Sequence, residues 1–415
     1  MSREYQLILW GATGFTGQLV AEHLFKRIGW DSMRWALGGR SREKLEHTRQ
    51  QLGRGAGKID LITGDSTRPE DMRSLAERAD VIVSTVGPYA RYGNELVAAC
   101  ARAGTHYCDL TGEVPWMRRM IDAHHTTARL SGAVIVHACG FDSIPFDMGV
   151  WMLQNEAMKR FGQPLQRVHT YVRAMRGGLS GGTAASMMDI AEEASQSRRT
   201  ARLLRNPYAL NPHNTTDGED RDNLFGFGRD ELIGDWVGPF FMAGVNTRIV
   251  RRTNALTGYR YGRDFRYSEY LLGGDGFAGA AKAAAISVGS TTMMLAAAFK
   301  PTRALLRQFV LPKSGQGPNE TEREAGFFRL YLAGIDRAGN SLGATLTGER
   351  DPGYGSTSRM LGESALSLAS REPIRVNGGG GFSTPAAALG ADLAQRLLRH
   401  AGLTFEVDTD IGENG

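Results

Sequence analysis

Short apolar runs alternate with longer amphipathic stretches along the first 150 residues of the chain. The apolar residues Leu7 to Trp10 are followed by a helical pattern, QLVAEHLFKRI, and by a second apolar run at Trp35 to Leu37. A short continuous apolar run is typical of a strand buried on both faces. Further strand-like runs follow, separated by helical stretches, at residues 59–63, 81–85, 107–109 and 135–138. The alternation predicts an α/β domain built on a doubly wound parallel sheet.

Three glycines join the first apolar run to the first helical pattern in GATGFTG. At such a junction Gly11 permits a tight turn, Gly14 lets another group approach the backbone, and Gly17 lets the helix pack on the strand. Free N–H groups and the helix dipole favour a phosphate there. A plain turn fits the spacing too, but the position within a βαβ unit favours a Rossmann-type dinucleotide site. The predicted residues are Gly11, Ala12, Thr13, Gly14, Phe15, Thr16 and Gly17.

The end of the second strand indicates which dinucleotide binds. A site selective for NAD usually has Asp or Glu about 20 residues past the glycines. Here the strand ends in Arg40, followed by Ser41 and Lys44. A guanidinium can make a forked contact with a 2′-phosphate, so the sequence predicts NADP(H). The alternative is that Arg40 is an ordinary solvated residue at a helix start.

Two further loops follow strands of the predicted sheet. Ligands of such sheets bind outside the carboxyl ends of the strands. The third strand is followed by Asp65 and Ser66, expected near the adenine. The fourth is followed by a loop expected near the nicotinamide, although each residue could also belong to a plain turn: Thr85, Val86, Gly87 and Pro88.

Composition and charge limit the classes of protein. A chain of 415 residues suggests two domains, and 41% hydrophobic with 22% charged residues is ordinary for a globular protein. The net charge of +5 and pI of about 9.1 fit anionic ligands or membrane surfaces, but the charge is too dispersed for nucleic acid. No zinc-ligand motif appears, so no metal is predicted. Three unpaired cysteines and the absence of a secretion-signal pattern lead us to expect a cytoplasmic protein.

The longer motifs carry a family resemblance. The segments GATGFTG, LGGRS, STVGPYARYG, YCDLTGE, HACGFDSIPFD, RGGLSGGT and GERDPGYGSTSRMLGESALSLA resemble the saccharopine dehydrogenase-like oxidoreductases, in the bacterial branch with the mycobacterial trans-acting enoyl reductases. The resemblance implies a Rossmann-type domain of residues 1–150 and 355–412, closed by C-terminal helices, with an inserted second α/β (α+β) domain over 151–354. It also implies NADP(H)-dependent reduction of a polyketide-derived, lipid-like acyl substrate, free or carrier-bound.

Enoyl reduction requires a proton as well as a hydride. Tyr89 and Tyr92, in the loop after the fourth strand, are the first candidate donors, and His137 and Asp142 are the second. For each, a structural role is an equal alternative. Three other functions stay open: a saccharopine-type C–N oxidoreductase, an aldehyde dehydrogenase using Cys139 as nucleophile beside His137, and a non-enzymatic module that binds NADP(H) and a partner or lipid surface.

The region expected to form the second domain contributes three expectations. Thr183 is expected to cap the helix AASMMDIAEEASQ, and residues 206–231 to form an irregular loop. Arg248, Arg251 and Arg252 could meet an acidic carrier protein or lie in solvent. Residues 283–299 carry no charge, and Lys300, Arg303, Arg307 and Lys313 follow. They are expected to form either a core or homodimer helix, or a helix on an anionic membrane at the inner face of the plasma membrane.

Overall fold

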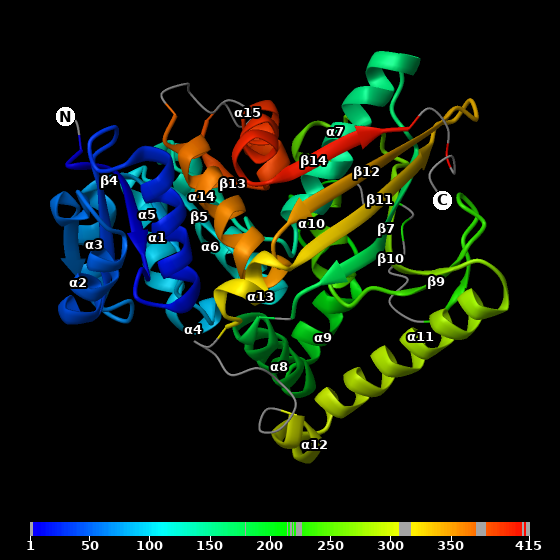
Figure 1. Ribbon diagram of the computed structural model, residues 1–415, viewed down its shortest axis with the longest axis horizontal. Coiled ribbons are helices and arrows are strands. Elements are labelled where there is room, and N and C mark those ends of the chain that lie inside the picture. Colours follow the sequence, from blue (N-terminus) through cyan, green and yellow to red (C-terminus); the bar gives the residue numbers. More distant parts are fainter. Residues whose placement is uncertain are drawn as a thin grey trace.

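The computed structural model describes residues 3–178, 180–213, 215, 218, 220, 226–306, 317–370, 379–408 and 411. Within these residues the chain forms two seven-stranded sheets (Figure 1). The first is parallel throughout, with the order β13-β6-β5-β4-β1-β2-β3, which confirms the predicted doubly wound sheet. Its strands are β1 (Tyr5–Trp10), β2 (Trp35–Gly39), β3 (Asp60–Thr63), β4 (Ala79–Ser84), β5 (His106–Asp109), β6 (Val134–Val136) and β13 (Gly381–Ser383).

Helices cover both faces of the first sheet, which is why β1 is apolar at nearly every position. Leu7 and Leu9 belong to the core beneath α1 and α14, whereas Ile8 and Trp10 belong to the core beneath α3, α5 and α6. The helices of this half are α1 (Phe15–Ile28), α2 (Arg42–Gln51), α3 (Pro69–Glu77), α4 (Tyr89–Tyr92), α5 (Asn94–Ala103), α6 (Val114–Ser131) and α14 (Thr357–Leu368), with a 3₁₀ turn at Ala56–Lys58.

The second sheet is mixed and has the order β14-β12-β11-β7-β10-β9-β8. β7 and β10 are parallel, and the other neighbours are antiparallel. Its strands are β7 (Arg167–Arg176), β8 (Gly228–Arg229), β9 (Trp236–Pro239), β10 (Arg266–Gly274), β11 (Phe327–Ile335), β12 (Ser341–Glu349) and β14 (Leu403–Val407). The remaining helices are α7 (Ile144–Phe161), α8 (Gly181–Gln196), α9 (Arg198–Arg205), α10 (Ala243–Leu256), α11 (Gly276–Ala298), α12 (Lys300–Leu305), α13 (Glu320–Glu324) and α15 (Pro385–His400), with a π-helical turn at Pro352–Ser356.

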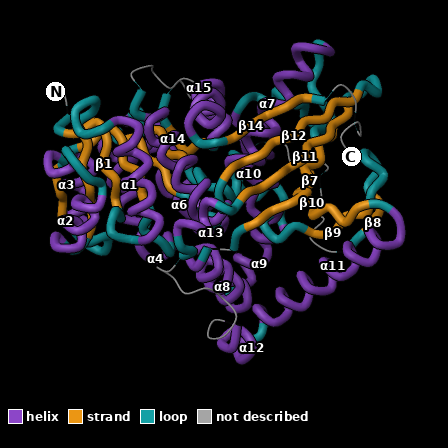
Figure 2. The backbone as a smooth tube through the Cα atoms, in the orientation of Figure 1, coloured by secondary structure: helices purple, strands orange, loops and turns teal. Residues whose placement is uncertain are grey.

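The C-terminal segment is shared between the two sheets, which corrects the expected domain boundaries. α14 packs on α1, and β13 extends the first sheet, as the resemblance implied for 355–412. However, β14 pairs with β12 and completes the second sheet, while α15 lies between α14 and α7 (Figure 2). The expected boundary at residue 150 falls inside α7, which runs unbroken from one half to the other.

Side-chain hydrogen bonds fix the first turns of two helices. α15 begins as its sequence suggests, because Thr384 accepts a hydrogen bond from Ala387 N and proline occupies the first turn. α8 begins earlier than expected: Ser180, not Thr183, is its cap, and its hydroxyl accepts from Thr183 N at 3.0 Å. The predicted loop at 206–231 lies partly outside the described residues.

Candidate active site

The glycine turn after β1 has the geometry that its spacing predicts. Gly11 has φ +94°, and a Cβ there would lie 2.6 Å from Thr85 Oγ1. A Cβ on Gly17 would lie 2.1 Å from the Gly11 carbonyl oxygen. At exposed Gly14, by contrast, a Cβ would meet only that same oxygen, at an ordinary 3.6 Å. Two glycines are therefore required by the fold, and the third leaves open backbone at the N-terminus of α1, where phosphate binding is favoured.

Arg40 stands exposed at the end of β2. Its guanidinium has no hydrogen-bond or ion-pair partner among the residues that the structure describes. Asp65, at the end of the neighbouring strand, has its pKa lowered by hydrogen bonds from Thr67 and by the charge of Arg40. Ser41 caps α2 by accepting from Lys44 N. A guanidinium without a protein partner at this edge fits a 2′-phosphate.

Arg40→Ala is expected to raise the Kd for NADPH about tenfold, equivalent to about 1.4 kcal/mol, because a charge-assisted contact to the 2′-phosphate is lost. Binding of NADH, which lacks that phosphate, should not change. Fluorescence titration with each nucleotide measures both. Arg54→Ala is the matched control, because Arg54 is exposed and the change in net charge is the same. An equal loss for NADH, or an unchanged Kd for NADPH, would contradict the assignment.

Two hydrogen bonds that involve side chains hold the loop after β3 in place. Trp10 donates its indole N–H to Ser66 Oγ at 2.9 Å, and Asp65 N donates to Asp71. Ser66 is buried. Its hydroxyl therefore supports the loop, and Asp65 is the more accessible of the two residues predicted near the adenine.

The loop after β4 lies against the glycine turn, at the switch point between β1 and β4. Thr85 Oγ1 donates to the Gly11 carbonyl at 3.1 Å, and Thr85 N donates to Trp10 O. The Gly87–Pro88 peptide bond is cis. Thr85, Val86 and Pro88 are half-buried and Gly87 is exposed, so the structure brings both predicted cofactor loops to one edge.

Glu113, which the sequence interpretation passed over, holds this edge together. Its carboxylate accepts from the backbone N–H groups of Tyr89 and Ala90, each at 2.8 Å, and from Ser186 Oγ on α8 at 2.8 Å. Burial raises the pKa of Glu113, and the three hydrogen bonds act against that shift. Glu113 thus ties the loop after β4 to α8 of the second half.

Tyr89 does not occupy the position expected of a proton donor. It is 4% exposed, donates its hydroxyl to Ser84 O at 3.0 Å, and packs on Trp116. Burial raises its pKa well above the usual value. The structure therefore argues against Tyr89 as the donor. Tyr92 is half-buried at the end of α4, and its hydroxyl has no hydrogen-bond partner in the described part of the chain.

His137 belongs to a buried pair instead. Its Nδ1 lies 2.8 Å from Asp109 Oδ2, and its ring packs against Trp116 and Phe382. Asp109 also accepts from Thr111 N, which fixes the loop after β5. His137 Nε2 is buried and has no partner among the described residues. The His137 ring therefore lies in the core among aromatic side chains. Its position does not support the predicted role as proton donor to the substrate.

Asp142 does reach a pocket, and that pocket lies between the two halves. The carboxyl is half-buried, and Thr183 Oγ1 donates to Asp142 Oδ2 at 3.4 Å from the start of α8. Ser180 Oγ lies 2.8 Å from Thr183 Oγ1. Burial raises the pKa of Asp142 to about 6, against the opposing effect of the Thr183 hydrogen bond. The interdomain pocket is lined by Thr16, Leu110, Gly140, Phe141, Asp142, Met175, Gly178, Ser180, Thr183, Phe241, Pro352, Gly353 and Thr357.

The GERDPGYG motif, residues 348–355, contributes Pro352 and Gly353 to the wall of this pocket. Asp351 accepts from Tyr354 N and Gly355 N and so closes the π-helical turn. Tyr354 packs edge-on against Phe15 of the glycine turn, with ring centroids 4.9 Å apart, and its hydroxyl accepts from Gly181 N. One tyrosine therefore joins the glycine turn to the start of α8, which no local sequence signal indicates.

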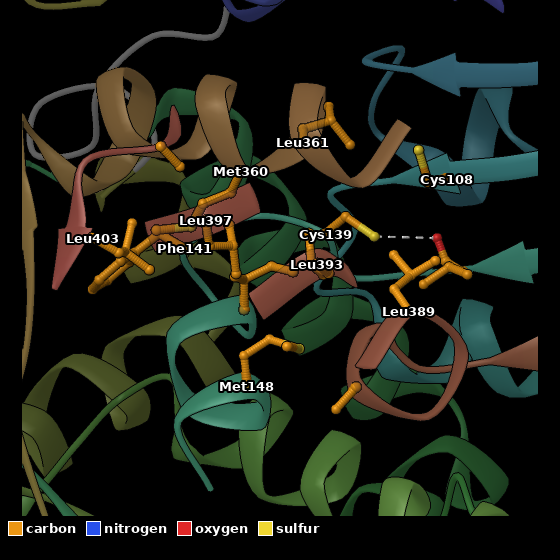
Figure 3. Packing of buried hydrophobic residues seen from close by; sticks show 14 of the residues in the cluster. Cys108, Cys139, Phe141, Met148, Met360, Leu361, Leu389, Leu393, Leu397 and Leu403 are labelled. Atoms are coloured by element: carbon orange, nitrogen blue, oxygen red, sulfur yellow. Dashed lines mark hydrogen bonds between the residues drawn. The ribbon is translucent and has the colours of Figure 1, made fainter. Parts of the chain in front are cut away.

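Cys139 is a core residue. It has no exposed surface, and its thiol contacts Val136 O at 3.7 Å among apolar side chains of the first core, including Leu389 and Leu393 (Figure 3). A nucleophilic cysteine must reach its substrate. The geometry therefore does not support the alternative of a Cys139-dependent aldehyde dehydrogenase. Among the described residues, no group of three His, Cys, Asp or Glu side chains could hold a metal ion.

The three arginines of α10 are buried, contrary to both sequence expectations. Arg248 donates to Asn206 O and Leu204 O, and Arg252 donates to Phe382 O at 2.8 Å and to Leu210 O. Arg251 donates to Asp220 Oδ2 and Tyr267 O. Burial lowers the pKa of Arg252 to about 9. They fix the segment after α9 and are not a surface for a carrier protein.

Comparisons with known proteins agree with this geometry. Residues 7–136 match the family model of the saccharopine dehydrogenase NADP binding domain. The trans-acting enoyl reductase of Mycobacterium ulcerans (strain Agy99) is 40% identical over 407 residues, covering 95% of this chain and 96% of that protein. A protein of Mycobacterium tuberculosis (strain ATCC 25618 / H37Rv), provisionally named a trans-acting enoyl reductase, is 42% identical over 404 residues with the same coverage.

A solved structure shares the fold. The apo saccharopine dehydrogenase (L-Glu forming) of Saccharomyces cerevisiae aligns with a TM-score of 0.53 and 11% identity, covering 97% of this chain and 100% of that chain. This neighbour confirms the predicted fold. The matched domain and the relatives confirm the predicted cofactor NADP(H) and an NADP-dependent oxidoreductase.

Proposed function

The chain belongs to the family of the trans-acting enoyl reductases, and from that premise we propose that it reduces the C=C bond of an enoyl thioester with a lipid-like, polyketide-derived acyl chain. The observation that carries this proposal is the interdomain pocket. It places a carboxyl group whose pKa is raised to about 6 beside the glycine turn.

The lining of the pocket favours a substrate without charge at its reacting end. None of the described residues that line it is Lys, Arg or His; they are apolar, hydroxyl-bearing or glycine, apart from Asp142. An amino-acid substrate with two or three carboxylates calls for cationic partners. The pocket therefore supports acyl reduction over a saccharopine-type C–N oxidoreductase, although the fold accommodates both.

NADPH, when bound, supplies the hydride that adds to the β carbon of the enoyl group. A negative charge then develops on the thioester oxygen, and the α carbon takes a proton. Asp142 is partly protonated near neutral pH and is the proton donor of this proposal. Thr183 holds one carboxyl oxygen, while the Ser180–Thr183 hydroxyl pair at the N-terminus of α8 offers dipoles to the developing charge.

The test is turnover of enoyl thioesters of increasing chain length, followed by loss of NADPH absorbance. With NADPH deuterated at the transferred position, mass spectrometry should find deuterium on the β carbon of the product. Coenzyme A and carrier-protein thioesters are compared, to decide how the substrate is presented. Turnover of saccharopine instead would favour C–N chemistry. Tight NADPH binding without turnover of any thioester would favour the non-enzymatic module.

A further inference from the structure

Helix α11 is apolar but lies largely exposed on the surface of the protein. Among the described residues it alone is long and apolar enough to cross a membrane, yet only 17% of its most apolar stretch is buried. A core helix of the same composition would be mostly buried. α11 runs along the outer edge of the second half and ends beside α12 (Figure 1).

Four large apolar side chains of α11 and its C-terminal end form one outward line, whereas Met293 and Met294, 41% and 45% exposed, lie off it. Phe277, Val288, Leu295 and Phe299, which directly follows the helix, are 90%, 66%, 55% and 64% exposed. On an ideal helix these positions lie within about 40° of each other. The small buried residues Gly279, Ala283 and Ser287 lie on the opposite side, against β9 and β10. The helix therefore packs on β9 and β10 through small residues and exposes a line of large apolar side chains.

The charged residues of α11 and of the segment that follows it have one sign. Between Asp275 and Glu320 the sequence contains no Asp or Glu. Lys282 and Lys300 are exposed. Arg303 is not available to a ligand, because it is buried and donates to Ala297 O, near Glu192 of α8. Arg307 and Lys313, which were expected to extend the basic end, lie outside the described residues.

We propose that α11 and the start of α12 form a docking surface for an anionic lipid bilayer, with α11 lying in the plane of the interface. A bilayer fits better than a second copy of this chain. The large side chains are separated along the line by Ala281, Ala285 and Thr292, which leaves few projections for the close interlocking of a protein interface. Two copies would also bring lysines together, whereas anionic lipids attract them. The resulting location is the inner face of the plasma membrane.

Helix α8 contacts both this surface and the interdomain pocket. That helix starts at the pocket with Ser180 and Thr183, and packs on α11 near its other end, where Glu192 lies 3.9 Å from Arg303. Docking would therefore place the pocket close to a source of lipid-like substrates. The binding proposal itself does not depend on the reaction proposed above.

The test is flotation of the full-length protein with vesicles of phosphatidylcholine alone and with added phosphatidylglycerol, at low and high salt. We expect flotation with the anionic vesicles, weakened by salt, and at least about tenfold less partitioning for Val288→Glu/Leu295→Glu. Leu130→Glu is the matched control, because Leu130 is 85% exposed on α6, away from α11. NADPH titration shows that each variant is folded.

Three outcomes would overturn the proposal. The first is wild-type protein that ignores anionic vesicles at low salt, and the second is a double variant that floats as well as the wild type. The third is a concentration-dependent dimer in analytical ultracentrifugation that the double variant abolishes, without flotation of the wild type. That result would assign the surface to a second copy of the chain.

Discussion

Asp142→Asn is expected to lower kcat for enoyl reduction about 10²- to 10⁴-fold, the usual contribution of a general acid, while the Kd for NADPH stays unchanged. The asparagine keeps the size of the side chain and can still accept the hydrogen bond from Thr183. What it lacks is the proton. Steady-state kinetics combined with cofactor titration separates the two effects.

The dependence of kcat on pH tests the same role of Asp142. Asp142 must be protonated to act, and its pKa is raised to about 6, so wild-type kcat should be highest below that pH and fall about tenfold per unit above it. In Asp142→Asn this descending limb should be absent. Thr183→Val removes a hydrogen bond that lowers the pKa of Asp142, so the limb should move to higher pH. Wild-type turnover in Asp142→Asn would mean that the proton comes directly from water.

Gly17→Ala is expected to destabilise the protein by about 3 kcal/mol and to abolish NADPH binding. Its Cβ would lie 2.1 Å from the Gly11 carbonyl oxygen, a backbone atom that cannot move without distorting the turn. Urea unfolding and NADPH titration measure the two losses.

Gly14→Ala is the matched variant. Gly14 has φ −77° and ψ 161°, which alanine adopts freely, and its Cβ would meet only an ordinary contact. Stability should stay within about 1 kcal/mol, whereas NADPH binding should weaken, because the methyl group fills the space open to the phosphates. Equal destabilisation by both substitutions, or unchanged NADPH binding in Gly14→Ala, would refute this division of roles.

Much of the first half was predictable because its signals are local. The glycine turn and the strand ends at Arg40 and Thr85 each depend on a few adjacent residues whose backbone preferences agree with the fold. The exposed position of Arg40 also follows from its place at a strand end. The length and composition of α11 could be read from the chain, but not that its large face is uncovered.

The errors share a cause as well. Tyr89 and Asp142 both follow strands of the same sheet, and the sequence favoured Tyr89 over Asp142 as the proton donor. The tyrosine points into the core, while the aspartate meets Thr183, 41 residues away. The α10 arginines were expected at the surface because arginine usually is, but inside the protein they donate hydrogen bonds to carbonyls of distant segments, including Leu204, Asn206 and Phe382.

The sequence by itself determined the parallel sheet, the glycine turn and the assignment of NADP(H), because hydrophobic period, glycine conformation and charge at a strand end act over a few residues. Only the tertiary structure decided which carboxyl lines the pocket, which arginines are buried and which sheet receives β14. Burial, pKa and strand pairing depend on segments distant in the chain, and their positions follow from packing the whole molecule.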